Sequence, residues 1–202
     1  MAEVSLKDWT CNNVSINKTN GYANNSIQIR HNEDYYATEP KAVKMLLELE
    51  KFKGIIWECA CGEGHLSEEI KKFGFNVYSS DLIDRGYGNV KDFLSIENFN
   101  ETDMNIITNP PYKYANEFII KAMTILKEGN KLALFLPIRY LEGKARKRIY
   151  KDFPPKTIYV SSGRLICAFN GNFEAQTNSA VCYAWFVWQK GYKGETVLKW
   201  FN

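Results

Sequence analysis

Residues 54–64, Gly-Ile-Ile-Trp-Glu-Cys-Ala-Cys-Gly-Glu-Gly, combine a short apolar run with a glycine-rich turn. The run predicts a buried strand over 54–59, and the turn at Gly62-Glu-Gly64 predicts the start of a helix over about 65–72. A glycine-rich turn between a strand and its helix lets a ligand approach the backbone closely, at the carboxyl end of a parallel sheet. This stretch therefore predicts an α/β fold and a ligand site at one edge of its sheet.

The segments on both sides of this stretch alternate between helix and strand patterns. An amphipathic stripe that follows Pro40 predicts a helix ended by Gly54, and a second strand is predicted over 75–79. Further strands are predicted over 105–108 and 131–136, with a helix at roughly 114–127 between them. The turns are short enough for parallel crossovers, so the pattern indicates an α/β sheet covered by helices on both faces.

The last third of the sequence has a different pattern. A basic helix is expected around 142–151, and two runs rich in aromatic and β-branched residues follow near 156–169 and 179–189. Because no helix separates the two runs, they are expected to pair antiparallel at one edge of the sheet. No internal repeat and no low-complexity linker is evident. We therefore expect a polar N-terminal arm over 1–33 and one folded domain over 34–202.

The composition excludes several classes of protein. Of the 202 residues, 45% are hydrophobic and 24% are charged, as in soluble globular domains and unlike disordered chains. No window approaches the roughly 18 apolar residues of a membrane span, and the first residues lack signal-peptide features, so we expect a cytoplasmic protein. Five irregularly spaced cysteines predict reduced thiols, and the net charge of +3 is only a weak hint of an anionic partner.

Two further motifs point to a ligand and to a reaction. Asp81 closes the second predicted strand, where a carboxylate can bind two ribose hydroxyls. Asn109-Pro-Pro-Tyr112 follows an apolar strand, and its prolines fix the backbone and leave carbonyl oxygens facing outward. The asparagine amide oxygen and the Pro110 carbonyl then form a paired acceptor for an exocyclic amino group. Tyr112 offers a face on which a base can stack, worth roughly 1–3 kcal/mol.

Glu58-x-Ala-Cys-Gly62-x-Gly64 followed by Asn109-Pro-Pro-Tyr112 resembles the cofactor and catalytic motifs of S-adenosylmethionine-dependent N6-adenine DNA methyltransferases, most closely the small phage and prophage type. The resemblance covers about residues 34–190. It implies a Rossmann-like class I methyltransferase fold, with a mostly parallel seven-stranded sheet and an antiparallel edge hairpin. It also implies S-adenosylmethionine as cofactor, S-adenosylhomocysteine as product and no metal. We expect no separate target-recognition domain in residues 34–202.

The resemblance also implies a role for particular residues. The catalytic group would be Asn109, Pro110, Pro111 and Tyr112. Within the cofactor site, Tyr36-Ala-Thr-Glu-Pro40 would close over the methionine moiety, Asp81 would bind the ribose, and Asp92 and Phe93 would hold the adenine. The full set of cofactor-binding residues would be Tyr36, Thr38, Pro40, Glu58, Ala60, Gly62, Gly64, Asp81, Leu82, Asp92, Phe93 and Asn109.

The expected mechanism follows from these residue types. An adenine amino group is a poor nucleophile. If Asn109 and the Pro110 carbonyl accept hydrogen bonds from its two N–H groups, electron density is concentrated on the amino nitrogen. A base inside a duplex cannot reach such a pocket, so it must be flipped out and stacked on Tyr112. Phe173, between the two late strands, is expected either to form a second wall of this pocket or to cover the core as an ordinary loop aromatic.

Basic residues gather directly after the strand that follows the catalytic motif. Between positions 139 and 151 the single acid Glu142 is surrounded by Arg139, Lys144, Arg146, Lys147, Arg148 and Lys151. This run is either a solvated helix face or a surface for a nucleic-acid backbone, with Arg139, Arg146, Lys147 and Arg148 as the expected contacts. We expect a nucleic-acid partner, DNA in the first place, and no membrane. The sequence carries no signal for the oligomeric state.

Other functions remain open at this point. Related methyltransferases with Asn-Pro-Pro-Tyr modify RNA bases or the glutamine side chains of proteins. RNA suits a minimal basic domain as well as DNA does. The glutamine enzymes usually have a helical N-terminal substrate domain, which the weakly patterned residues before the core do not predict. A non-catalytic nucleic-acid-binding module on the same fold is a further alternative, although the complete Asn109-Pro-Pro-Tyr112 motif argues against it.

Overall fold

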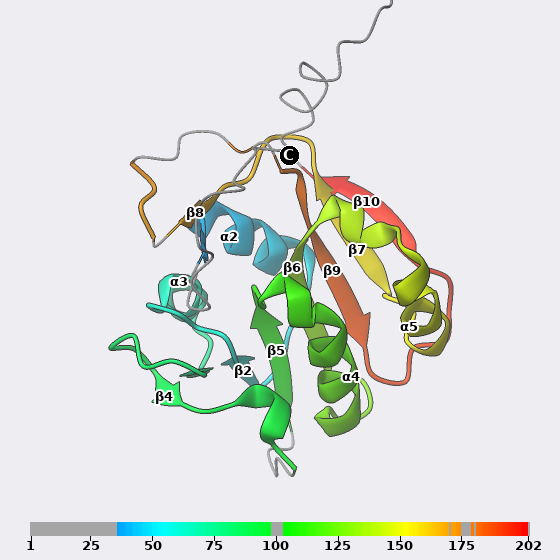
Figure 1. The fold of residues 1–202 in the computed structure, drawn as a ribbon, viewed down its shortest axis with the longest axis horizontal. Helices are drawn as coiled ribbons and strands as arrows, with labels where there is room; N and C mark the ends of the chain where they lie inside the picture. The colour runs from blue at the N-terminus through cyan, green and yellow to red at the C-terminus, as the bar shows by residue number, and fades with distance from the viewer. Residues whose placement is uncertain (1–35, 98–102, 170, 175–178, 180, 202) are drawn as a thin grey trace, which may run out of the picture. The chain divides into compact units, whose positions relative to one another are not determined.

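The computed structural model describes residues 36–97, 103–169, 171–174, 179 and 181–201 (Figure 1). The arm expected over 1–33 lies outside these residues. The described strands are β1 (Tyr36–Thr38), β2 (Ile55–Glu58), β3 (Val77–Asp81), β4 (Asn89–Val90), β5 (Met104–Thr108), β6 (Lys131–Pro137), β7 (Thr157–Ser161), β8 (Cys167–Phe169), β9 (Tyr183–Gln189) and β10 (Val197–Phe201). The described helices are α2 (Pro40–Leu49), α3 (His65–Lys72), α4 (Ala115–Ile125) and α5 (Lys147–Asp152), with 3-10 turns η1 (Phe93–Ser95), η2 (Tyr112–Tyr114), η3 (Ile138–Leu141) and η4 (Lys144–Arg146).

The main sheet has eight strands in the order β10-β7-β9-β6-β5-β2-β3-β4, and β1 and β8 form a separate antiparallel pair. All neighbours in the main sheet are parallel except β9, which runs antiparallel to both β6 and β7. The predicted α/β fold with a mostly parallel sheet and antiparallel strands is thus confirmed.

The C-terminal part of the sheet differs from the expectation in two details. The sheet has eight strands, and the antiparallel pair β7–β9 does not lie at its edge, because β10 pairs along the outer side of β7. Both edges of β9 are paired, one with β6 and the other with β7. The next strand, β10, therefore pairs with the free outer edge of β7.

Two predicted elements are broken by local turns. The run 156–169 divides into β7 and β8, and in the turn after Ser161 the Ser161 hydroxyl donates to the Gly163 carbonyl at 2.6 Å. The basic helix expected around 142–151 starts late, as η4 followed by α5. Gly143, with φ of 124°, adopts a backbone that other residues rarely take and separates η4 from η3.

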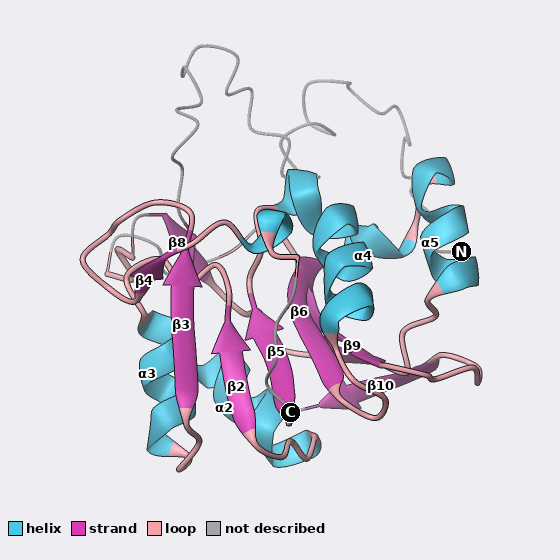
Figure 2. Ribbon diagram, turned by 90° about the horizontal axis from the view of Figure 1, so that it is seen from below, coloured by secondary structure: helices cyan, strands magenta, loops and turns pink. Residues whose placement is uncertain are grey.

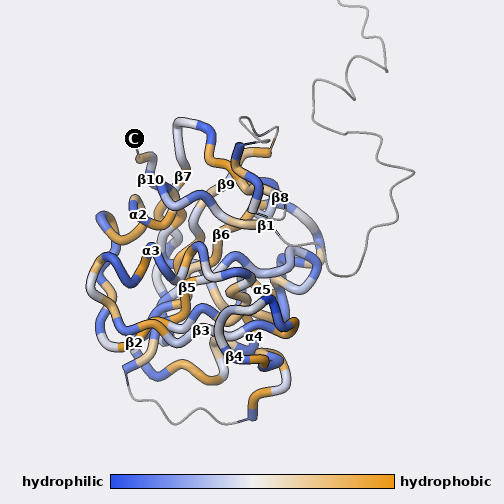
Figure 3. Tube along the Cα trace, turned by 90° about the vertical axis from the view of Figure 1, so that its left-hand side faces the viewer, coloured by the Kyte–Doolittle hydropathy of each residue, from blue (hydrophilic) through white to orange (hydrophobic). Residues whose placement is uncertain are grey.

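Helices cover both faces of the sheet, as Figure 2 shows. Alternate strand residues point to opposite faces, so Ile56 and Ile107 join a buried cluster with α2 and α3, whereas Trp57 and Ile106 join a second cluster with α4 and α5. The alternation of hydrophobic and hydrophilic residues along the chain can be followed in Figure 3. No described helix is both long and apolar enough to cross a membrane.

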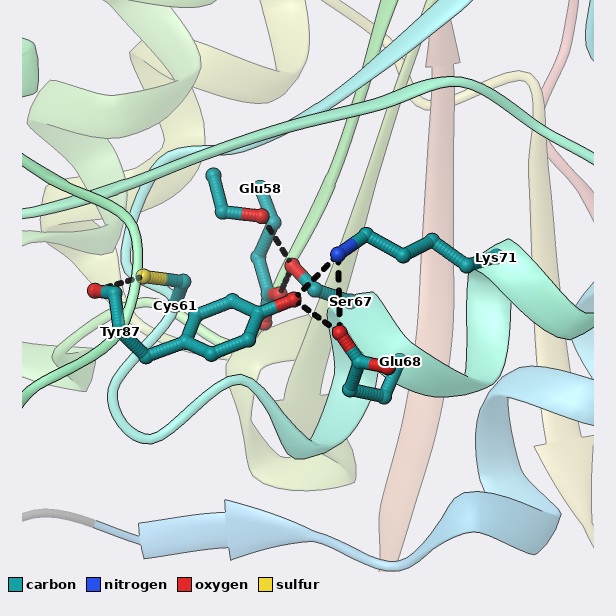
Figure 4. A network of polar contacts seen from close by, with 7 residues as sticks. Glu58, Cys61, Ser67, Glu68, Lys71 and Tyr87 are labelled. Carbon is teal, nitrogen blue, oxygen red and sulfur yellow. Dashed lines mark hydrogen bonds and ion pairs between the residues drawn. The ribbon is translucent and has the colours of Figure 1, made fainter.

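A buried polar network joins β2, β3 and α3 beneath the glycine turn (Figure 4). The Glu58 side chain, 2% exposed, accepts a hydrogen bond from the Ser67 hydroxyl, which lies 2.6 Å from the Ser79 hydroxyl. Burial is the main reason that the pKa of Glu58 rises to about 8, and the neighbouring Asp81 raises it further. Glu58 therefore stays mostly protonated at neutral pH and ties the turn to the sheet without a net charge.

Glutamine at position 58 tests this buried acid, because it keeps the shape and the acceptor but cannot ionise. In the wild type the unfolded chain releases the Glu58 proton near pH 4.5 and the folded chain only near pH 8, so the free energy of unfolding falls as pH rises between these values. Glu58→Gln should lack this decline, which is on the order of a few kcal/mol. Urea unfolding across this pH range measures it.

The matched control is Glu48→Gln, which changes an exposed carboxyl on α2 and should keep the wild-type pH dependence. Parallel curves for the wild type and Glu58→Gln would show that the Glu58 carboxyl is ionised in the folded protein.

Candidate functional site

The site lies where three neighbouring strands end. β2 pairs in parallel with β3 on one side and with β5 on the other, so the carboxyl ends of the three strands lie at the same edge of the sheet. Glu58 ends β2, Asp81 ends β3, and Asn109 follows β5 directly. Their positions agree with the sequence prediction that residues from separate motifs meet at this edge.

The glycine turn after β2 is fixed against Asp81. The Gly62 N–H donates to Asp81 Oδ2 at 2.8 Å, and the Ile83 N–H donates to Asp81 Oδ1 at 3.0 Å. Gly64, with φ of 85°, precedes α3, and a Cβ on it would lie 2.4 Å from the Tyr87 ring. The turn thus needs glycine for its backbone and for its packing. It holds the half-buried Asp81 carboxylate at the carboxyl end of β3.

The other residues near this turn take different positions. Ala60 is half-buried, and Leu82 is 63% exposed directly after Asp81. The ring of Phe173 lies 5.8 Å from that of His65, the first residue of α3, in an edge-to-face arrangement. Phe173 therefore borders the glycine turn, and its role as a wall of a base pocket stays a prediction.

The Asn109 amide has one satisfied end and one unsatisfied end. Its Nδ2 donates to the Tyr36 carbonyl at 3.2 Å and lies 3.8 Å from Cys167 Sγ. Its Oδ1 is buried and has no hydrogen-bond partner among the described residues. A carbonyl oxygen can only accept, so the amide nitrogen must face Tyr36 and the amide oxygen must face the other way. A buried acceptor without a donor costs roughly 1–3 kcal/mol. A ligand that donates to Asn109 Oδ1 would remove this cost.

The backbone beside Asn109 offers a second acceptor. The Pro111 carbonyl accepts from the Tyr114 N–H at 2.8 Å, whereas the Pro110 carbonyl receives no backbone N–H from the described part of the chain. Neither proline has an N–H of its own to donate. Asn109 Oδ1 and the Pro110 carbonyl are therefore neighbouring acceptors on adjacent residues.

Tyr112 is half-buried, and its hydroxyl lies 3.7 Å from Cys167 Sγ. Its ring is tilted by 41° to the ring of Tyr183, with 6.2 Å between the centroids. Burial raises the pKa of Tyr112 well above its usual range, so the hydroxyl remains protonated.

The segment before α2, Tyr36-Ala-Thr-Glu-Pro40, lies against Asn109, and its closure over a methionine moiety stays a prediction. β1 pairs with β8, and the Glu39 N–H donates to the Ile166 carbonyl at 3.1 Å. Tyr36 is 46% exposed, Thr38 is buried, and Pro40 is exposed at the first turn of α2. The Tyr36 carbonyl brings this segment into contact with Asn109.

Asp92 and Phe93 lie at the start of η1. The Asp92 carboxylate accepts from the Leu94 N–H at 2.9 Å and thereby caps η1. Phe93 is 2% exposed, and its ring lies 5.2 Å from Trp57 and 4.8 Å from Phe118 in the core. The Phe93 side chain thus packs mainly between core rings, and its contact with a cofactor stays a prediction.

The basic segment, residues 139–151, follows β6, whose carboxyl end lies beside that of β5 because the two strands are parallel. Arg139, Lys147 and Arg148 are exposed, and Arg148 forms an ion pair with Asp152 at 3.4 Å. The Arg146 guanidinium lies 4.3 Å above the centre of the Tyr140 ring, so Arg146 also has a packing role.

Cys167 is a residue of this site that the sequence did not single out. It lies 58 positions after Asn109, and it was grouped with the other thiols because no local motif surrounds it. No group of three or more histidine, cysteine, aspartate or glutamate side chains within the described residues is placed to hold a metal ion.

Comparison with known proteins gives matches in structure and none in sequence. No protein-family model and no curated protein matches the chain. A modification subunit attributed to a type I restriction enzyme from Vibrio vulnificus YJ016 is similar with a TM-score of 0.59 at 12% identity, covering 94% of this chain and 50% of that one. The type IIG restriction endonuclease BpuSI has a TM-score of 0.57 at 14% identity, covering 82% of this chain and 26% of that one.

A third similar structure is a Listeria monocytogenes protein described as a class I S-adenosylmethionine-dependent methyltransferase. Its TM-score is 0.52 at 14% identity, covering 79% of this chain and 62% of that one. This chain therefore spans less than two thirds of the length of each of the three proteins. At these identities the likeness concerns the fold, which is the Rossmann-like fold of class I methyltransferases.

Proposed function

We propose that this protein transfers a methyl group from S-adenosylmethionine to the exocyclic N6 amino group of adenine in DNA. The observation that carries the proposal is the buried Asn109 Oδ1, which has no hydrogen-bond partner among the described residues and lies at the edge of a methyltransferase-like sheet, on the residue before Pro110. A pair of acceptors suits a ligand group with two N–H bonds, which an exocyclic amine has and a ring carbonyl lacks.

The residues at the edge of the sheet fit the cofactor. Each Asp81 oxygen accepts one backbone N–H and keeps further acceptor capacity, which suits the two ribose hydroxyls. Gly62 and Gly64 leave room for close approach to the turn, and the exposed Leu82 offers an apolar contact beside Asp81. Tyr36, Thr38 and Pro40 would lie over the methionine moiety. When bound, S-adenosylmethionine supplies a methyl group on a positively charged sulfur.

The reaction requires the chain to prepare the amine. Asn109 Oδ1 and the Pro110 carbonyl accept its two N–H bonds and orient the nitrogen lone pair away from themselves. Because both acceptors are held in place before the reaction, they stabilise the positive charge that develops on this nitrogen without reorganising. Alignment of the two reacting atoms at about 3 Å supplies much of the remaining rate enhancement.

DNA is the favoured acceptor for two reasons. Two of the structures with this fold come from restriction enzymes, and the basic segment lies on the side of the sheet that carries the Asn109 motif. A base would have to leave the duplex to reach Asn109, and the half-buried Tyr112 ring would then support it.

The proposal is tested by incubating the protein with labelled S-adenosylmethionine and with duplex DNA, single-stranded DNA or total RNA in parallel. We expect N6-methyladenine among the nucleosides released from DNA. Label in RNA alone would shift the proposal to an RNA adenine methyltransferase. Cofactor binding without label in any nucleic acid would point to a protein acceptor such as glutamine, or to a non-catalytic binding module.

Asn109→Ala and Asp81→Ala should separate catalysis from cofactor binding. Removing one preorganised group at a reacting centre typically lowers the rate ~100- to 1,000-fold, and we expect this loss for Asn109→Ala with little change in cofactor affinity. Asp81→Ala should weaken cofactor binding roughly tenfold or more, since it removes charge-assisted hydrogen bonds. Calorimetry and single-turnover transfer measure the two effects.

The matched control is Asn76→Ala, which changes an exposed asparagine. Equal loss of cofactor binding and methyl transfer in Asn109→Ala would contradict the assignment.

Lys147→Gln combined with Arg148→Gln should weaken DNA binding and lower the slope of log affinity against log salt by about 1–2, because up to two phosphate contacts are lost. Arg146 is left intact because it packs on Tyr140.

The control pair is Lys44→Gln combined with Lys51→Gln, which removes the same charge from α2 and the turn after it, near the opposite face. Fluorescence anisotropy at several salt concentrations compares the pairs, and equal slopes would make the basic segment a solvated surface.

A further inference from the structure

The Asn109 amide is held by a small ladder that lies outside the main sheet. The Tyr36 carbonyl belongs to β1 and the Cys167 thiol belongs to β8, and these two strands pair antiparallel with Thr38 opposite Cys167. Both atoms lie on the nitrogen side of the amide. One structural unit, distant in sequence from the Asn109 motif, therefore contacts both donors of the amide group.

The same thiol also reaches the other end of the motif. Cys167 is 1% exposed, and its sulfur lies 3.7 Å from the Tyr112 hydroxyl as well as 3.8 Å from Asn109 Nδ2. Burial raises the pKa of the Cys167 thiol to about 11, so the thiol stays protonated and can accept from one neighbour while donating to another. It bridges the first and the last residue of Asn109-Pro-Pro-Tyr112.

This arrangement has a consequence for the ligand. Rotation of the amide by half a turn would lose the hydrogen bond to the Tyr36 carbonyl and bring Oδ1 against that carbonyl, two acceptors that repel. The thiol favours the same orientation when its proton is directed to the Tyr112 hydroxyl, because it then offers Asn109 only an acceptor. The orientation that remains presents only an acceptor to the site. An exocyclic amine is then favoured over a carbonyl group, which would need a donor.

We propose that Cys167 is a positioning residue, which together with the Tyr36 carbonyl fixes the Asn109 amide and the Tyr112 hydroxyl so that the site presents an acceptor to an exocyclic amine. The part of this statement that concerns the amine rests on the proposed function. The orientation of the amide is a property of the protein alone, so it can be tested without a substrate.

The first test compares three variants in single-turnover methyl transfer. Cys167→Ala removes the hydrogen-bonding group and should lower the rate by about three- to tenfold, as expected for one lost hydrogen bond, while cofactor affinity stays unchanged. Cys167→Ser keeps a small group that accepts and donates, and should restore most of the rate. Cys182→Ala, which removes an exposed thiol, should behave as the wild type. Equal losses in the alanine and serine variants, or no loss in alanine, would overturn the proposal.

The second test measures hydrogen exchange of the Asn109 side-chain amide by ¹⁵N NMR, with the signal assigned by its loss in Asn109→Ala. Exchange should be faster in Cys167→Ala than in the wild type, and unchanged in Cys182→Ala. Equal exchange in all three would overturn the positioning role. If the wild type methylates no nucleic acid, the proposed function fails, while the exchange experiment still decides whether Cys167 orients Asn109.

Discussion

The parallel pairing of β2 with both β3 and β5 determines where the polar groups at the ends of these three strands lie. It brings the glycine turn, Asp81 and Asn109 to one edge although they come from three separate segments. The register is fixed by the two buried clusters, because a slip by one residue would exchange Ile56 and Trp57 between the faces. The packing that stabilises the sheet therefore also sets the position of the polar groups at its end.

These polar groups are held at a cost in stability. Asn109 Oδ1 is buried without a donor among the residues that the structure describes, and the Glu58 carboxyl is buried in its protonated form. Each is a group that folding alone disfavours by roughly 1–3 kcal/mol or more. The two groups differ, however, in whether a described residue gives them a hydrogen bond. Glu58 accepts a hydrogen bond from Ser67 and joins α3 to the sheet, whereas Asn109 Oδ1 receives no donor from the part of the chain that the structure describes.

Much of this arrangement follows from local sequence and some does not. The helix over 65–72 and the strands near 105–108 and 131–136 were predictable, because glycine turns and apolar runs act over a few residues. The place of β10 depends on which strand edge is free, and the burial of Phe93 depends on rings from β2 and α4. The role of Cys167 likewise does not follow from local sequence, because only the pairing of β1 with β8 brings it to Asn109.

The Asn109-Pro-Pro-Tyr112 motif and the β1–β8 ladder thus have different roles in the site. Asn109-Pro-Pro-Tyr112 provides the acceptor atoms, and the β1–β8 ladder provides the direction in which the amide presents them. The ladder strand that holds Asn109 through the Tyr36 carbonyl also continues into Pro40, in the segment expected to lie over the methionine moiety. A movement of that segment on cofactor binding would act directly on the amide. Cofactor and target would then be linked through one backbone carbonyl, and the amide would reach its working orientation only with β1 in place.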